Sequence, residues 1–203
     1  MSKLDLKKKY REFYSPSIKE CSVVDVPEMQ FLMIDGSGDP NTSVAYREAL
    51  EALYAMSYTL KFYSKITLGV DYVVMALEGL WWTGDMAEFS ADDKDSWDWT
   101  SMIMQPDHIT AAHVEAAIGE VRRKKDPPAL DRVRFESFRE GLSVQIMYIG
   151  PYADEAPTIA RLHQFAADRG YQLRGKHHEI YLGDPRRTAP EKLRTVIRQP
   201  VSE

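Results

Sequence analysis

The residues best suited to acid–base or ligand chemistry lie near the C-terminal end of the chain. His177, Glu179 and Tyr181 alternate within a strand-like run from 175 to 182. Alternation along a β-strand puts these three side chains on one face. Burying an unpaired ionised glutamate costs several kcal/mol, so an inward-facing Glu179 requires a partner, a proton or a cationic ligand. We therefore expect this face to line a binding site. The opposite face carries the residues expected in the core: His178, Ile180 and Leu182.

A second carboxylate, Glu78, lies in the apolar run from 72 to 83. One face of this run is uniformly apolar, which favours the core: Val73, Met75, Leu77, Gly79 and Trp81. The other face would then present Tyr72, Glu78 and Trp82 to Glu179. A single β-bulge would exchange Trp81 for Trp82, so both tryptophans remain candidates.

Glu78 and Glu179 together would permit general acid and base catalysis if a low-dielectric pocket moved one pKa towards neutrality. The alternative interpretation is that Glu78 is a solvated residue at a strand end. Both interpretations stay open from the sequence.

The four tryptophans all fall between 81 and 99, which indicates an aromatic wall. Trp97 and Trp99 share one face of a predicted strand, and we expect at least one of them at the rim of the site. Aromatic rings beside a carboxylate suit flat cationic or electron-poor ligands, through stacking and cation–π attraction.

No metal or other cofactor is expected. His177 and His178 are adjacent on a strand, so their side chains point to opposite faces and do not suit one mononuclear site. The remaining histidines lack ligand spacing, and the single cysteine, Cys21, excludes an intrachain disulfide and a four-cysteine metal site. The chain has no Gly-x-Ser-x-Gly motif and no complete glycine-rich phosphate loop.

Composition narrows the partners and the compartment. The 203 residues carry a formal net charge of -5, which makes nucleic acid an unlikely partner. The N-terminal residues lack the apolar segment of a signal peptide, and the most apolar run, from 72 to 77, is too short to cross a bilayer. We expect a soluble cytoplasmic protein that does not bind membranes; its oligomeric state is open.

The order of predicted elements repeats along the chain. A strand from 22 to 34, a helix from 42 to 64 and strands from 71 to 83 and 97 to 104 form one set. A second set has a strand from 142 to 149, a helix from 154 to 168 and strands from 171 to 182 and 193 to 198. We infer an internal duplication of strand-helix-strand-strand modules within one domain of the α+β class.

The expected boundaries divide this single domain, residues 1 to 203, into four parts. A packed N-terminal arm covers residues 1 to 20, and the first module covers 21 to 106. A linking helix follows over 107 to 128, and the second module covers 129 to 203. Neither module is large enough to bury its own sheet well, so the two should pack together.

Five segments of the sequence resemble GyrI-like small-molecule-binding proteins, which are relatives of the effector domains of multidrug-responsive transcription activators. The segments are Val26-Pro27-Glu28, 38 to 42, 77 to 82, 145 to 152 and 177 to 187. The resemblance implies two modules related by a pseudo-twofold axis, with antiparallel sheets flanking a central ligand cleft that contains Glu179. In these proteins the position of Tyr148 is often a histidine. A tyrosine does not titrate near pH 7, which weakens any catalytic role at this position.

The resemblance also implies the function. We expect a cleft that binds bulky aromatic or cationic compounds. Some stand-alone members of the family hydrolyse DNA-alkylating natural products that carry a cyclopropane ring, so the resemblance implies a hydrolytic activity as well. Glu179, with Tyr148 or Tyr72, would then orient or deprotonate water. Two alternatives remain: sequestration without catalysis, and regulation of a protein partner such as DNA gyrase.

Overall fold

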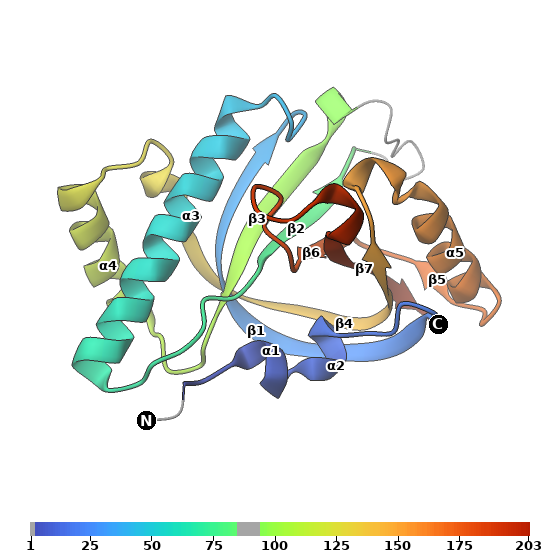
Figure 1. Ribbon diagram of the computed structural model, residues 1–203, viewed down its shortest axis with the longest axis horizontal. Coiled ribbons are helices and arrows are strands. Elements are labelled where there is room, and N and C mark those ends of the chain that lie inside the picture. Colours follow the sequence, from blue (N-terminus) through green and yellow to red (C-terminus); the bar gives the residue numbers. More distant parts are fainter. Residues whose placement is uncertain (1–2, 85–93) are drawn as a thin grey trace.

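The computed structural model describes residues 3–84 and 94–203, which form one curved antiparallel sheet and, within these ranges, five α-helices (Figure 1). The strands are β1 (Ser22–Ser37), β2 (Leu77–Trp82), β3 (Asp98–Gln105), β4 (Arg134–Ile149), β5 (Gln172–Leu173), β6 (His177–Tyr181) and β7 (Arg194–Ser202). The helices are α1 (Leu6–Lys9), α2 (Arg11–Tyr14), α3 (Val44–Tyr63), α4 (Ala111–Lys124) and α5 (Ala156–Ala167).

The sheet closes on itself like a barrel. Its strand order is β4-β1-β3-β2-β6-β7-β5, and β4 also pairs with β7. The two long strands make this possible, because β1 and β4 pair with each other and then each pairs with a further strand, β1 with β3 and β4 with β7. Figure 1 shows both strands curving beneath the shorter ones. Closure leaves few unpaired strand edges exposed.

Helix α3 forms as the sequence predicts. The Ser43 side chain accepts a hydrogen bond from the Tyr46 amide at the start of the helix, a favourable N-cap. Its apolar stripe, which includes Leu53, Met56 and Leu60, is fully buried and packs on β1 and β3. Helix α5 packs on β4 and β7 at the other side of the β2–β6 pair (Figure 1).

The N-terminal arm is packed, as expected. Leu6, Phe13 and Tyr14 are buried, and Leu4 forms an isolated bridge with Tyr72. The predicted strand from 71 to 83 starts too early. Strand β2 begins only at Leu77, and Tyr72 forms only this isolated bridge.

Two other strand predictions also differ from the structure. The predicted strand from 142 to 149 is the second half of β4, which begins at Arg134. The predicted strand from 171 to 182 is divided into β5 and β6, with Gly175 at a positive φ of 64° between them. The acidic loop from 84 to 96 lies largely outside the described residues.

Across residues 3–84 and 94–203, the helices are all too short or too polar to pass through a lipid bilayer.

Candidate functional site

The carboxylate of Glu179 is held by donors at both of its oxygens. His177 Nε2 lies 3.2 Å from Oε1, and the Tyr181 hydroxyl donates to Oε2 at 2.7 Å. The Trp81 indole donates in turn to the Tyr181 hydroxyl at 3.0 Å. The Glu179 side chain keeps 14% of its surface exposed. These contacts confirm that His177, Glu179 and Tyr181 share one face of β6.

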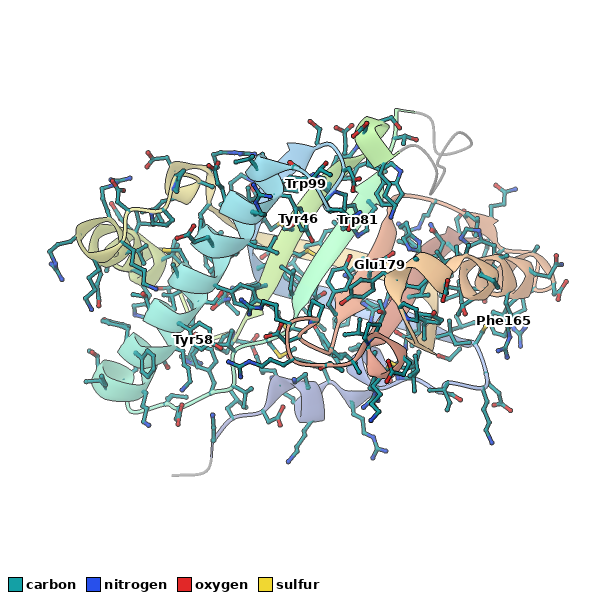
Figure 2. The ribbon with its side chains drawn as sticks, turned by 45° about the horizontal axis from the view of Figure 1, so that its top comes forward. Tyr46, Tyr58, Trp81, Trp99, Phe165 and Glu179 are labelled. Carbon is teal, nitrogen blue, oxygen red and sulfur yellow. The ribbon has the colours of Figure 1, made fainter. Side chains whose placement is uncertain are left out.

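Aromatic rings from α3, β2 and β3 meet on the same face of the sheet (Figure 2). Tyr46, in the first turn of α3, lies 5.9 Å from Trp81 and 5.1 Å edge-on from Trp99. Trp97 lies 5.5 Å from Trp81. The sequence left open which tryptophan of the pair at 81 and 82 faces Glu179, and the structure shows that it is Trp81.

Two glycines make room for these indoles. Gly79 is directly opposite Glu179 in the β2–β6 ladder, and a Cβ there would lie 2.6 Å from Trp81 Nε1. A Cβ on Gly36 would lie 2.3 Å from the Trp99 ring. Real Cβ contacts are not this close, so the missing side chains let the Trp81 indole lie over its own strand and the Trp99 indole over the neighbouring strand β1.

A second carboxyl group, Glu155, adjoins Glu179. It lies at the start of α5, it is 3% exposed, and it is close enough to Glu179 to be affected by its charge. Burial and the negative charge of Glu179 raise the pKa of Glu155 to about 9. Glu155 is therefore neutral at pH 7. Tyr152, just before it, packs edge-on against Tyr181 at 5.4 Å.

Glu179 remains ionised beside this neutral acid. Burial alone would raise the pKa of Glu179, but the hydrogen bonds and charge of His177, together with hydrogen bonds from Tyr181 and Glu155, hold it below its usual value. Two neighbouring carboxyl groups thus have opposite protonation states at pH 7. This is the arrangement that lets one act as an acid and the other as a base.

The expected partner of Glu179 in acid–base chemistry, Glu78, lies on the opposite face of the sheet. In the β2–β6 register Gly79 is opposite Glu179, whereas Glu78 is opposite Ile180. The prediction that Glu78 and Trp82 lie on the face of β2 next to Glu179 is therefore wrong. The expected pairing of Glu78 with Glu179 is wrong for the same reason. Trp82 shares the face of Glu78, where the Lys176 ammonium lies 3.2 Å above its ring.

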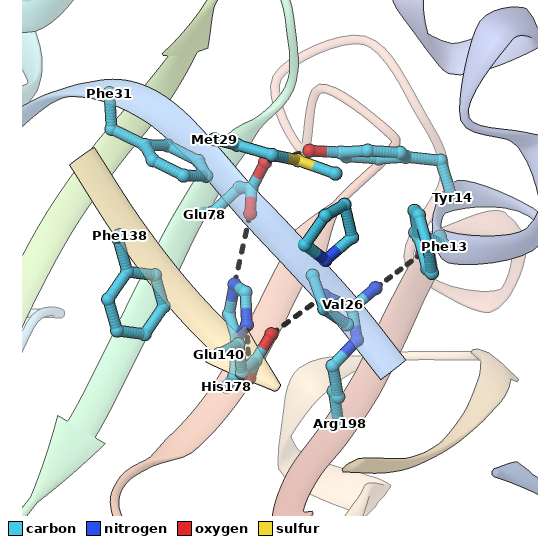
Figure 3. A pocket seen from close by; sticks show the side chains of 11 residues that line it. Phe13, Tyr14, Val26, Met29, Phe31, Glu78, Phe138, Glu140, His178 and Arg198 are labelled. Carbon is cyan, nitrogen blue, oxygen red and sulfur yellow. Dashed lines mark hydrogen bonds and ion pairs between the residues drawn. The ribbon is translucent and has the colours of Figure 1, made fainter. Parts of the chain in front are cut away.

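Glu78 instead belongs to a buried chain of charged side chains (Figure 3). The Tyr14 hydroxyl donates to Glu78 at 2.7 Å, and His178 bridges Glu78 and Glu140 at 3.0 and 2.9 Å. Arg198 donates to the second oxygen of Glu140 at 2.9 Å. We call these five residues the buried charge network. Each charged side chain in this network contacts a side chain of the opposite charge. The network therefore suits a structural role better than the binding of a charged ligand.

The pKa values in the buried charge network follow from this pairing. Burial alone would lower the pKa of His178, but Glu140 and Glu78 raise it to about 9. Burial alone would raise the pKa of Glu140, but His178 and Arg198 lower it to about 2. Arg198 also donates to the carbonyl of Phe13 at 2.6 Å, which ties the N-terminal arm to the sheet.

The two tyrosines expected to assist catalysis do not contact Glu179. The Tyr148 hydroxyl donates to the Pro151 carbonyl at 3.0 Å. Tyr148 and Tyr181 flank Thr195 in adjacent ladders, so Tyr148 shares the face of Glu179 without touching it. Tyr72 is buried elsewhere, with its ring 5.8 Å from His108, so its expected place beside Glu179 is wrong.

Sequence reasoning missed Tyr46, Tyr152 and Glu155. Tyr46, Tyr54 and Tyr58 are three tyrosines of α3 at spacings of eight and four, which places them on one side of the helix and was a usable signal. Glu155 gave none, because an acidic residue at a helix start normally complements the helix dipole. Within the described parts of the chain, no group of three or more His, Cys, Asp or Glu side chains is arranged to hold a metal ion.

Comparisons with known proteins identify the family of the chain. Residues 19–202 match the family model of the GyrI-like small-molecule-binding domain. The chain is 42% identical to a conserved protein from Listeria innocua described as uncharacterized, with a TM-score of 0.92 over 98% of this chain and 100% of that one. It is 41% identical to a hydrolase from the same organism, with a TM-score of 0.89 over 99% and 100%.

A more distant structure shares only the fold. The C-terminal domain of EcmrR is 11% identical, with a TM-score of 0.56 over 91% of this chain and 98% of that one. A comparison with curated protein sequences found no match. The family model spans nearly the whole chain, and the chain belongs to the GyrI-like small-molecule-binding domain family.

Proposed function

We propose that this protein binds flat aromatic or cationic compounds against Glu179 and hydrolyses those that carry a strained cyclopropane ring. The observation that carries the proposal is a pair of neighbouring buried carboxyl groups beside an aromatic cluster, one (Glu155) with its pKa raised and the other (Glu179) with its pKa lowered. The similarity to the Listeria innocua hydrolase supports the chemistry.

Binding would use the partial exposure of the site. Glu179 supplies a negative charge, and Tyr46, Trp81 and Tyr152 supply ring faces and edges around it. A cation placed on aromatic rings and next to a carboxylate gains from both interactions. The surrounding low-dielectric environment makes that charge attraction stronger than it is in water.

Hydrolysis would use the two carboxyl groups in turn. Glu179 accepts a proton from water as the water oxygen forms a bond to a cyclopropane carbon. The ring C–C bond breaks, and its electron pair moves into the conjugated carbonyl of the substrate, which takes the proton of Glu155. Transfer of the proton from Glu179 to Glu155 then restores the starting state, so the net reaction is the addition of one water molecule.

The setting of this function also forms part of the proposal. We place the protein in the cytoplasm, in agreement with its single cysteine, where it would protect the cell from DNA-alkylating compounds. Its negative net charge favours a small-molecule partner over nucleic acid.

We further propose that residues 21–106 and 129–203 are two modules related by a pseudo-twofold axis, with the site between them. The ladders support this, since exchanging β1 with β4, β2 with β6 and β3 with β7 reproduces the same neighbours around the closed sheet. The arm, 1–20, and the linking helix region, 107–128, lie outside the repeat.

The test is to incubate the purified protein with a cyclopropane-bearing alkylator and to follow the compound by mass spectrometry. We expect a product heavier by one water molecule. Glu179→Gln should slow its formation by about a hundredfold or more, as loss of a general base does. The matched control, Glu191→Gln, changes an exposed glutamate and should leave the rate unchanged.

Glu155→Gln separates the two carboxyl roles. It keeps the shape and a hydrogen-bond donor but has no transferable acid proton, so it should bind the compound normally and hydrolyse it slowly. Retained binding without any water adduct in the unmodified protein would overturn the hydrolytic part of the proposal and leave sequestration as the function.

A further inference from the structure

A cavity of about 200 Å³ lies on the face of the sheet opposite to Glu179. Its apolar walls are Leu80, Phe138 and Pro200, and Leu80 is opposite His178 in the β2–β6 ladder. The register therefore separates this cavity from the proposed site, because Gly79 and Glu179 point away from it. We call it the rear cavity.

Three cationic side chains border the rear cavity: Arg139, Arg174 and Lys176. The one carboxylate among its lining residues, Glu140, is already neutralised, because His178 and Arg198 bind its two oxygens. The cavity thus combines an apolar interior with a positive border.

Two of these cations have unused capacity for hydrogen bonds. The Lys176 ammonium is half-buried over the Trp82 ring, and no acceptor among the described residues bonds to it. Burial accordingly lowers the pKa of Lys176. Arg174 uses Nε and Nη2 on backbone carbonyls, whereas its Nη1 has no acceptor in the described part of the chain.

We propose that the rear cavity binds a small carboxylic acid with a short apolar body. The body would occupy the space between Leu80, Phe138 and Pro200, and the carboxylate would bond to Lys176 and Arg174. The volume equals that of roughly seven water molecules at about 30 Å³ each. It is smaller than the pockets of about 300 Å³ and above that hold drug-sized ligands, so a small acid fits best.

The test is calorimetric titration of the full chain with octanoate, with neutral octanamide as the matched ligand. We expect octanoate to bind at least tenfold more tightly than octanamide. The variant Lys176→Met should reduce this preference about tenfold, because it removes the ammonium that is proposed to bond to the carboxylate while keeping most of the side-chain volume. Leu80→Phe should weaken both ligands by filling the cavity.

Glu179→Gln distinguishes the two sites, because it should leave octanoate binding unchanged. A melting curve and a titration with ethidium, which tests the Glu179 site, show whether the cavity variants are folded. Equal binding of octanoate and octanamide, absence of octanoate binding at millimolar concentration, or octanoate binding that is lost in Glu179→Gln and kept in Leu80→Phe would each overturn the proposal. None of these outcomes bears on hydrolysis at Glu179.

Discussion

Glu155 and Glu179 share one proton at neutral pH, and this has a measurable cost. Glu155 has an ordinary pKa of 4.5 and a pKa of about 9 in the folded protein. Above pH 4.5 the unfolded chain releases this proton while the folded protein retains it. The favourable contribution of Glu155 is therefore complete below pH 4.5 and is lost as the pH rises through about 9.

We predict that Glu155→Gln stabilises the protein at pH 8 by up to about 5 kcal/mol, at about 1.4 kcal/mol for each pH unit above 4.5, and has little effect at pH 4.5. The glutamine does not ionise, so it removes the pH-dependent cost. Urea unfolding of both proteins at the two pH values measures the difference. Glu191→Gln is the control, and an equal effect of Glu155→Gln at both pH values would contradict the assigned protonation state.

For single residues, the sequence predicted only which side chains share a face of a strand. His177, Glu179 and Tyr181 share a face because they are two residues apart, and this expectation is confirmed. The neutral state of Glu155 depends on its burial and on its approach to the charge of Glu179, 24 positions along the chain. Local patterns contain no information about such a contact.

The burial of strand β2 explains why the face that meets Glu179 was predicted wrongly. Residues 77–81 are all buried, and only Trp82 is partly exposed. An apolar face indicates the core only when the other face meets solvent, and here both faces are covered. The apolar side lies under α3 and holds the aromatic cluster, whereas the side with Glu78 faces the N-terminal arm.

The short arm helices are held by the buried charge network, which makes one hydroxyl group important for stability. We predict that Tyr14→Phe destabilises the protein by about 1–3 kcal/mol, because it leaves an oxygen of the buried Glu78 without its 2.7 Å donor. Urea unfolding at pH 7 measures the loss.

The matched control is Tyr58→Phe, since Tyr58 is exposed on α3. It should change the free energy of unfolding by less than about 0.5 kcal/mol. If both variants unfold at the same urea concentration as the unmodified protein, the network does not anchor the arm.

For the whole molecule, the sequence predicted the order of elements but not how they close. The helices expected at 42 to 64 and 154 to 168 agree with α3 and α5 to within two residues at each end. The β1–β4 and β2–β6 pairings join strands about 100 residues apart, and nothing in either strand specifies its partner. Closure follows from the length of β1 and β4. The strand predicted at 142 to 149 is only half as long as β4, so closure could not be predicted.

Closure also gives the molecule two chemically different faces. The helix-covered face carries Glu179 and its aromatic neighbours, whereas the opposite face carries the buried charge network and the rear cavity. A cationic aromatic ligand and a small carboxylate should therefore bind without competing, each by attraction to the opposite charge.

The central claim is that Glu179 anchors cationic aromatic ligands, and titration of ethidium against the unmodified protein and Glu179→Gln tests it most directly. We predict at least tenfold weaker binding to Glu179→Gln, equivalent to about 1.4 kcal/mol, with Glu191→Gln and Lys176→Met unchanged. Equal affinity of ethidium for the unmodified protein and Glu179→Gln would contradict the claim.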